Sequence, residues 1–438
     1  MTRRMSLCLL FLVVAPTRAS AQGVTLVDAV RSALAERPAL AMAAATRDAA
    51  AADRARAASE WLPRLSLDAG VTRFEEPMLV SPLHGFDLEQ IPDFDRTLVD
   101  ATLGARWTLF EGGARLARSR SARAGLRAAE AGVEATADAT IALTVAAYAD
   151  VVAARQTLEA HDLRLAALEA ERDRVAKALA EGAVAGVALA RADAARARAQ
   201  AERVAAAATL EVAAGDLARL TGLPEPGLVE RLALPPLELD PVAIPDSTAS
   251  PAVEQARWQA RAAAAASDAS RATWWPEVST RGAWIERGAG TDRDSFSGEW
   301  QLGLRLDWAL FTGGARAAAI SRAEAERVQA EQRLAQTELD RDAGMQRARA
   351  ALARARARTA ALEEAVAAGV EVARVERLSL DVGGGVQSDW LDAEADLLES
   401  RAALVRSRAD QLVAAVELAR VAGVLDLEWL ATRLEEVR

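Results

Sequence analysis

The sequence contains two copies of one pattern, and this duplication constrains the fold more than any other feature. Three residues recur at a displacement of 213 positions: Pro38, Trp61 and Pro63 return as Pro251, Trp274 and Pro276. The block Trp107–Arg115 returns as Trp308–Arg316 at a displacement of 201, which then holds to Gly222 and Gly423. A chain that keeps register in this way is built from two similar structural units. The units differ by 12 residues, all of which fall between these two blocks.

Proline separates the two units and shows where long helices can run. Six of the 14 prolines lie between residues 224 and 245, whereas the ranges 93–223 and 277–438 contain none. Because proline breaks helices, we expect the long helices in the proline-free ranges. The predicted organisation is a first repeat at 22–223, a linker at 224–250, a second repeat at 251–424 and a tail at 425–438.

Each repeat contains one stretch in which apolar and polar residues alternate. From Trp300 to Leu310 every second residue is apolar, and the ranges 65–71 and 99–109 show the same period of two. This period is typical of strands with one apolar face. We predict β-hairpins at about 64–110 and 277–311, each preceded by one helix and followed by two. The helices after the hairpins are expected at 114–180, 187–222, 313–380 and 388–423.

The same residue types mark the ends of both hairpins: Pro63 and Pro276 before the first strand, and Gly112, Gly113, Gly313 and Gly314 after the second. Proline favours extended backbone in the residue before it, which ends a helix and begins a strand. Paired glycines allow the chain to turn sharply into the next helix. The 12 additional residues map between Arg73 and Arg96, which we expect to form an exposed loop at the hairpin tip.

Tryptophans flank the apolar faces of the predicted strands. Trp61, Trp107, Trp274 and Trp308 lie where strands meet helices. This placement is typical of the aromatic girdles of membrane barrels, and strands of about ten residues suit a tilted membrane crossing. The alternative is a small sheet packed on a soluble core. Four strands cannot close a barrel, so a sheet in lipid must be completed by other subunits.

The last helix of each repeat has a heptad pattern. Its positions are Leu391, Leu398, Val405, Leu412 and Ala419 in the second repeat and Ala190, Ala197, Val204 and Ala218 in the first. Apolar residues at intervals of seven predict a coiled-coil seam, and small side chains allow the helices to approach closely.

The N-terminus indicates secretion. Two arginines precede an apolar run from Leu7 to Ala15, and small residues follow, which is the order of a signal peptide at 1–21. The only cysteine, Cys8, lies in this segment, so we expect no thiol in the mature chain. No later segment offers about eighteen uncharged apolar residues, so we expect no membrane-spanning helix.

Composition and motifs exclude several other classes of protein. The net charge of −10 disfavours a nucleic-acid partner. The sequence has no phosphate-binding glycine loop, no metal-spaced histidine or aspartate cluster and no nucleophile elbow. We therefore predict a protein that is not an enzyme and has neither cofactor nor metal.

The proline-led strands, the Leu-Phe-x-Gly-Gly exits and the turn at 381–393 together resemble the TolC-like outer membrane efflux proteins, and the resemblance covers essentially the whole mature chain. It implies a mainly α fold with two β-hairpins, in which three identical subunits form a twelve-stranded barrel in the outer membrane of a Gram-negative bacterium. The long helices would continue this barrel through the periplasm. The implied function is an exit duct for efflux or secretion that works with a periplasmic adaptor and an inner-membrane transporter.

The resemblance also implies roles for the helical tips. It assigns the pore constriction to Asp389 and Asp392, and adaptor contact to the turn residues Gly182, Val187, Gly383, Gly384 and Ser388. The two aspartates share one helix face because they are three residues apart. Capping is a compatible alternative, with Ser388 as the N-cap and acids stabilised by the helix dipole. The turn lacks the arginine of the family's founding type, so a specific gating salt bridge is not expected.

A second class of protein fits part of the pattern. A secreted periplasmic coiled-coil scaffold or adaptor without a pore would explain the signal peptide and the heptads. It would leave the two amphipathic hairpins with aromatic ends unexplained.

Overall fold

The computed structural model describes residues 25–80, 93–223, 250–290 and 296–435. The predicted signal peptide and residues 224–249 of the predicted linker lie outside these ranges. The first repeat contains α1 (Leu26–Glu36), α2 (Pro38–Ser59), β1 (Arg64–Leu79), β2 (Phe94–Phe110), α3 (Ala114–Ala180) and α4 (Gly186–Thr221). The second contains α6 (Pro251–Arg271), the 3-10 turn η2 (Ala272–Trp274), β3 (Glu277–Ala289), β4 (Ser297–Asp307), α7 (Ala315–Asp381) and α8 (Gln387–Ala422), and is followed by α9 (Leu427–Glu435).

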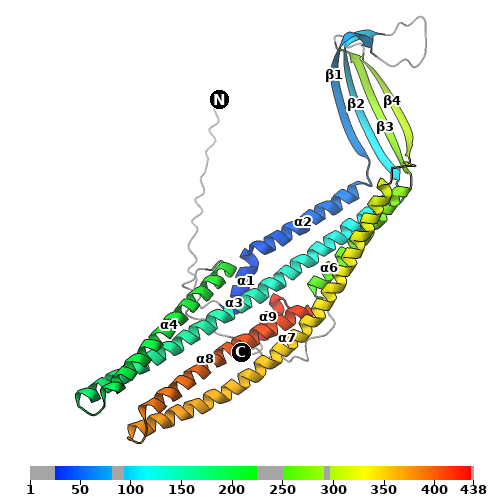
Figure 1. The fold of residues 1–438 in the computed structure, drawn as a ribbon. Coiled ribbons are helices and arrows are strands. Elements are labelled where there is room, and N and C mark those ends of the chain that lie inside the picture. The colour runs from blue at the N-terminus through cyan, green and yellow to red at the C-terminus, as the bar shows by residue number, and fades with distance from the viewer. Residues whose placement is uncertain (1–24, 81–92, 224–249, 291–295, 436–438) are drawn as a thin grey trace, which may run out of the picture.

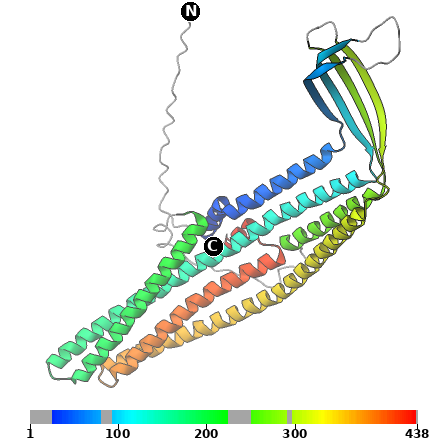
Figure 2. The same cartoon turned by 45° about the horizontal axis from the view of Figure 1, so that its top comes forward.

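The molecule is elongated, with a sheet at one end and two helical hairpins at the other (Figures 1 and 2). Helices α3 and α7 have 67 residues each. At 1.5 Å per residue each is about 100 Å long. Both begin at the residue directly after the glycine pair and end at a turn, after which α4 and α8 run in the opposite direction. The predicted fold class, mainly α with a pair of β-hairpins, is confirmed.

The four strands form one antiparallel sheet in the order β1-β2-β3-β4. In the first hairpin Arg64 pairs with Arg106, and in the second Glu277 pairs with Asp307. Displacements of 213 and 201 residues carry the first pair onto the second. The sequence duplication therefore extends to the register of the strands.

The strands differ from the prediction at two places. The insertion expected as a loop at 73–96 is strand in part, because β1 continues to Leu79 and β2 begins at Phe94. The middle of the insertion, residues 81–92, lies outside the described residues. The last strand ends at Asp307 and not near 311. Its counterpart β2 reaches Phe110 because β3 pairs with it there, whereas β4 has no second neighbouring strand among the residues that the structure describes.

Helix α8 packs on two helices, α7 of its own repeat and α3 of the other. Leu398, Leu412 and Ala419 of its predicted seam are buried. Helix α4 packs along α3, but among the residues with described structure it has no counterpart to the second long neighbour of α8. The seam predicted for the first repeat was therefore wrong about which face is packed within the subunit. Ala190, Ala197 and Val204 are exposed, and the buried heptad positions are Ala192, Ala199 and Ala206.

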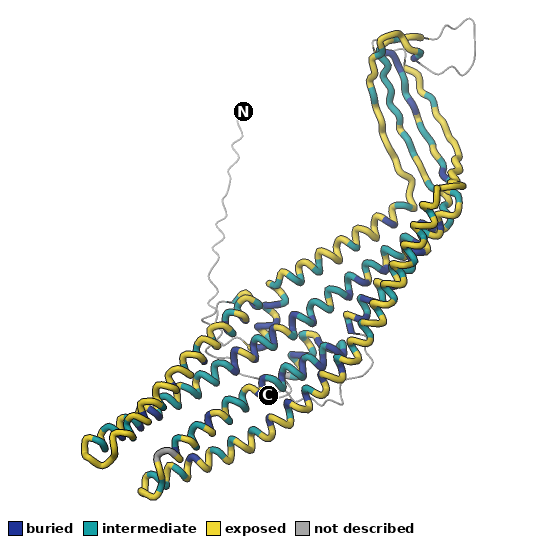
Figure 3. Tube along the Cα trace, viewed as in Figure 1, coloured by how far each residue is buried: buried dark blue, intermediate teal, exposed yellow. Residues whose placement is uncertain are grey.

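The largest core cluster lies midway along the helices, where α1 and α9 add to α3, α4 and α8 (Figure 3). Helix α9 was missed in the predicted tail, although its Leu430 is fully buried. By length and composition alone, one helix of the described residues, α3, could cross a membrane, contrary to expectation. More than half of that apolar stretch, 56%, is buried within the subunit. We attribute it to the bundle core, since Val145, Tyr148 and Val152 of α3 lie in this cluster.

Candidate functional site

The two junctions between sheet and helices are built alike. The indole N–H of Trp107 donates to the carbonyl oxygen of Trp61 at 3.0 Å, and that of Trp308 donates to Trp274 at 3.2 Å. These bonds join the residues before the first strand of each hairpin to its second strand. Trp107 lies in β2, and Trp308 directly follows β4. All four rings remain exposed in the subunit, and their assignment to a membrane girdle stays a prediction.

Each junction also holds an arginine that sequence reasoning missed. The guanidinium of Arg115 lies 4.6 Å from the ring centre of Trp61, and that of Arg316 lies 4.7 Å from Trp274. Arg115 also donates to the carbonyl oxygen of Thr108 at 2.7 Å, and Arg316 donates to the corresponding carbonyl. The signal was available, because both arginines close the duplicated nine-residue block.

The glycine pairs adopt the backbone that the turn into the helix requires. Gly112 and Gly113 have φ of 62° and 87°, and Gly313 and Gly314 have 60° and 88°. These angles favour glycine strongly. Gly112 is also tightly packed, because a Cβ there would lie 2.4 Å from the Cβ of Trp275.

One face of the sheet is apolar and unpartnered. Its exposed side chains include Leu65, Leu67, Val71, Leu302, Leu304 and Leu306. A soluble sheet would cover such a face with a helix or a second sheet, and no described element covers it (Figure 3). The arrangement therefore fits strands that face lipid.

The tips are tight turns that project free of the bundle (Figure 1). Gly182 and Gly383 occupy equivalent places with φ of 75° and 76°. Gly384 donates its N–H to the carbonyl oxygen of Ser379 at 3.0 Å. Val187 is exposed, so the first turn presents an apolar side chain to solvent.

Both predicted pore residues lie near the start of α8 and are exposed. Asp392 lines a cavity of about 400 Å³ that also includes Arg191 of α4 and Trp390 of α8; Asp389 does not line it. The expectation that Ser388 caps this helix was wrong. The helix begins at Gln387 with Val386 as its N-cap, which places Ser388 inside the first turn.

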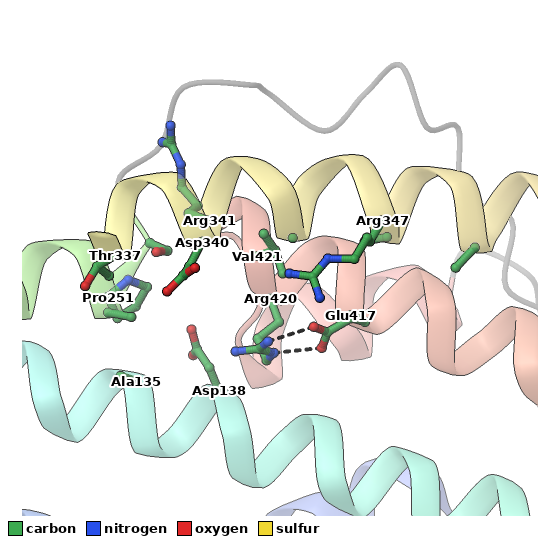
Figure 4. A pocket seen from close by; sticks show the side chains of 15 residues that line it. Ala135, Asp138, Pro251, Thr337, Asp340, Arg341, Arg347, Glu417, Arg420 and Val421 are labelled. Carbon is green, nitrogen blue, oxygen red and sulfur yellow. Dashed lines mark hydrogen bonds and ion pairs between the residues drawn. The ribbon is translucent and has the colours of Figure 1, made fainter. Parts of the chain in front are cut away.

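A polar cavity of about 470 Å³ lies midway along the bundle, between α3, α7, α8 and the start of α6 (Figure 4). Arg420 donates to both carboxylate oxygens of Glu417 at 2.7 and 2.8 Å. Asp138 points into this cavity and is only 8% exposed. Burial raises the pKa of its carboxyl to about 6, against the opposing effect of Arg420. Among the described residues, no group of three or more histidine, cysteine, aspartate or glutamate side chains could hold a metal.

Solved structures with the same fold are outer membrane proteins and channels. The chain is similar to the outer membrane protein VceC of Vibrio cholerae, with a TM-score of 0.76 and 22% identity over 91% of this chain and 96% of that one. It is similar to the CmeC channel of Campylobacter jejuni, with a TM-score of 0.80 and 17% identity over 94% of this chain and 90% of that one. It is also similar to the open state of the MtrE channel of Neisseria gonorrhoeae, with a TM-score of 0.73 and 20% identity over 91% of this chain and 89% of that one.

A comparison with the curated proteins finds no match. The sequence model of the outer membrane efflux proteins matches residues 29–223 and 248–424, which is most of the chain and both repeats. The chain therefore belongs to the outer membrane efflux protein family.

Proposed function

We propose that three copies of this chain assemble into a continuous duct that carries exported molecules across the periplasm and the outer membrane. The observation that carries the proposal is the four-stranded sheet, which stands on helices about 100 Å long, has an exposed apolar face and, within the described part of the chain, leaves both edges unpaired. An open sheet edge is not tolerated in hydrocarbon, so the edges must be closed by other copies. A coiled-coil scaffold without a pore has no use for this sheet.

The family gives the orientation of the duct. Its members are outer membrane channels, so the sheet lies in the outer membrane and the helices extend into the periplasm. The helical tips then point toward the inner membrane. We propose that the tip turns, with Gly182, Val187, Gly383, Gly384 and Ser388, contact a periplasmic adaptor protein coupled to an inner-membrane transporter.

The tips also supply the narrowest part of the proposed duct. Three copies of Asp389 and Asp392 around one axis would place six carboxylates at the periplasmic entrance. Carboxylates of one sign in a narrow opening concentrate cations there. The duct would therefore prefer cations at its entrance, whatever the chemistry of the exported molecule.

The test is purification in detergent followed by conductance in a planar bilayer. We expect a detergent-stable trimer, mixed α and β circular dichroism, and cation-selective single channels. A stable monomer that conducts alone would contradict the assembly. Release of the protein from membranes by salt or urea without detergent would favour the scaffold.

A further inference from the structure

Three arginines lie side by side in one row across the sheet. Arg64 of β1 pairs with Arg106 of β2, and Arg106 pairs with Arg281 of β3. Side chains of directly paired residues share a face of the sheet, with Cβ atoms about 4.5–5.5 Å apart. Like charges directly opposite each other destabilise a sheet, so folding alone does not explain this arginine row.

The arginine row lies on the polar face of the sheet, close to its helical end. Arg64 is the first residue of β1, and Arg281 is the fifth residue of β3. Leu65 follows Arg64 and its partner Ala105 precedes Arg106, so the apolar and the basic side chains point to opposite faces. With the apolar face toward lipid, the arginines face the interior of the proposed duct, near the point where strands give way to helices (Figure 1).

The charges of the arginine row are not neutralised within the described part of the chain. All three side chains are exposed, and none of them has a hydrogen bond or an ion pair with another described residue. The acids at this end of the polar face have other partners. Asp307 accepts from Arg305 at 2.8 and 3.0 Å, and Glu277 accepts from the hydroxyl of Thr108 at 3.3 Å.

The duplication does not account for the arginine row either. Each of its members has an acidic counterpart in the other repeat, at displacements of 213 or 201: Glu277, Asp307 and Asp68. The arginines therefore occupy positions that do not match between the repeats. The pairing of β2 with β3 brings them together.

The neighbouring positions leave the guanidinium groups accessible from the polar face. The adjacent row, away from the helices, consists of the small residues Ser66, Gly104 and Ala283. On β4, the partner of Arg281 is Gly303, where a Cβ would meet nothing within 4 Å. A large anion inside the duct can therefore reach the arginines without displacing a side chain.

We propose that the arginine row binds the carboxylate or phosphate groups of molecules that pass through the duct, so that its cargo includes organic anions. The planar guanidinium group binds both kinds of oxyanion through two parallel hydrogen bonds. Charged side chains that line a membrane barrel tune its selectivity, and arginines favour anions. The acids at the tips collect cations at the periplasmic entrance, whereas the arginine row acts further along the path, inside the barrel.

This inference rests on the duct proposed above, and single-channel conductance tests it. The probe is inositol hexakisphosphate, a polyvalent phosphate, added on the extracellular side. We expect it to block wild-type current. The triple variant Arg64→Gln, Arg106→Gln, Arg281→Gln should need about tenfold more of it for the same block, because charge-assisted hydrogen bonds are lost.

Two single variants separate the arginine row from the total charge of the polar face. Arg106→Gln removes one charge from the middle of the row and should weaken the block. Arg287→Gln removes one charge from the same face, but from an ion pair with Glu299 at 3.2 Å, and should change the block much less. Equal weakening in the two would show that the anion responds to the total charge and would overturn the site.

Thermal dissociation of the purified trimer tests the site without a bilayer. Inositol hexakisphosphate should raise the dissociation temperature of wild type, since a ligand that binds the folded state stabilises it, and should leave that of the triple variant unchanged. Without the anion, the triple variant should be at least as stable as wild type, because repulsion within the row is relieved.

The outcomes distinguish the anion site from the duct. Conducting trimers that show no response to the anion, or the same response in wild type and the triple variant, would overturn the anion site and leave the duct standing. A stable monomer that forms no channels would overturn both.

Discussion

Repeat 1 and repeat 2 share their elements, their hairpin register and their positive-φ glycines, but they differ in the chemistry of the membrane junction. In repeat 1, Arg115 is 6% exposed and forms an ion pair with Glu111, which also binds Arg118. Threonine and alanine stand at the counterparts of Glu111 and Arg118 in repeat 2. The difference follows from position, because repeat 1 is covered by repeat 2 of its own chain. Repeat 2 leaves its junction exposed in the subunit, with Trp274 and Trp308 facing solvent.

At the helical tips it is repeat 2 that carries the additional acidic residues. Repeat 2 carries Asp389 and Asp392 where repeat 1 has Ala188 and Arg191. Duplication has therefore preserved the scaffold, while the polar residues have specialised: repeat 1 has the ion pairs at the membrane junction and repeat 2 has the acids at the tip. Substitutions at matched positions measure how far this specialisation goes.

The largest effect is expected at the first glycine pair. In Gly112→Ala the new Cβ would meet Trp275 and the carbonyl oxygen of Ala272 at 2.7 Å, in a backbone region with positive φ. Left-handed backbone costs about 1–2 kcal/mol and overpacking about 1–3 kcal/mol more. We expect loss of most folded protein, measured by heat-resistant trimer on a gel.

Gly113→Ala is the control that measures the cost of a positive φ without a steric clash. Its φ is also positive, at 87°, but a Cβ there meets nothing within 4 Å. The loss of stability should be about 1–2 kcal/mol. An equal loss of stability in the two variants would show that Trp275 moves to accommodate the new Cβ and that packing at the repeat boundary tolerates it.

The junction arginines should rank next. Arg115→Ala leaves the carbonyl oxygen of Thr108 without this donor and removes the cation over Trp61. Such losses in a buried setting cost about 2–3 kcal/mol. Arg316→Ala should cost about 1 kcal/mol, since its surroundings are more exposed. The measurement is thermal unfolding by circular dichroism, and a larger effect at Arg316 would reverse the comparison between the repeats.

Asp138 should make stability depend on pH, whereas its counterpart Leu339 cannot. Burial raises the pKa of Asp138 from 3.8 to about 6 in the folded protein, so folding favours the protonated acid. The charged form destabilises the fold above about pH 6, and this penalty is relieved as pH falls from 6 toward 4. We expect wild type to gain about 1–3 kcal/mol over that range.

The neutral variant Asp138→Asn should lack this gain, as judged by thermal midpoints at pH 7.5 and pH 5. Asp150→Asn is the matched control, because Asp150 is an exposed carboxylate on the same helix that pairs with Arg406 at 2.9 Å. It should retain the gain. An identical pH response in wild type and Asp138→Asn would show that this carboxyl is charged throughout.

The sequence predicted the elements well because their signals are local. Proline, paired glycines and period-two alternation act over a few residues, and the bounds predicted for α3, α4, α7 and α8 agree with the structure within two residues. The single helix expected before the first hairpin was wrong, because two helices, α1 and α2, precede β1. The seam of α4 could not be predicted in this way. Its heptad is periodic on two faces, and the packing of α4 along α3 buries Ala192 and leaves Ala190 exposed.

The site was less predictable than the fold. Arg115 and Arg316 were visible in the duplicated block, but their role depends on the rings of Trp61 and Trp274, which precede the first strand of the same hairpin. The buried state of Asp138 depends on α7 and α8, which are distant from it in the sequence. The helical cap assigned to Ser388 failed because Val386 already has extended backbone, with φ of −105° and ψ of 136°.

The smallest effect on stability, and the sharpest on function, is expected at the tips. Asp389→Ala with Asp392→Ala should cost only about 0.3–1 kcal/mol for each helix-terminal acid, so the assembly should survive. Trivalent cations applied from the periplasmic side should block wild-type current and block the double variant less, since the ring of carboxylates is lost. The control is Asp193→Ala near the start of α4, which removes an acid of the other tip that pairs with Arg172 at 3.0 Å and should leave the block unchanged. Single-channel conductance in planar bilayers distinguishes the outcomes. Equal block in wild type and the double variant would show that these aspartates stabilise the start of the helix and do not line the pore, and the tips of the two repeats would then be functionally alike.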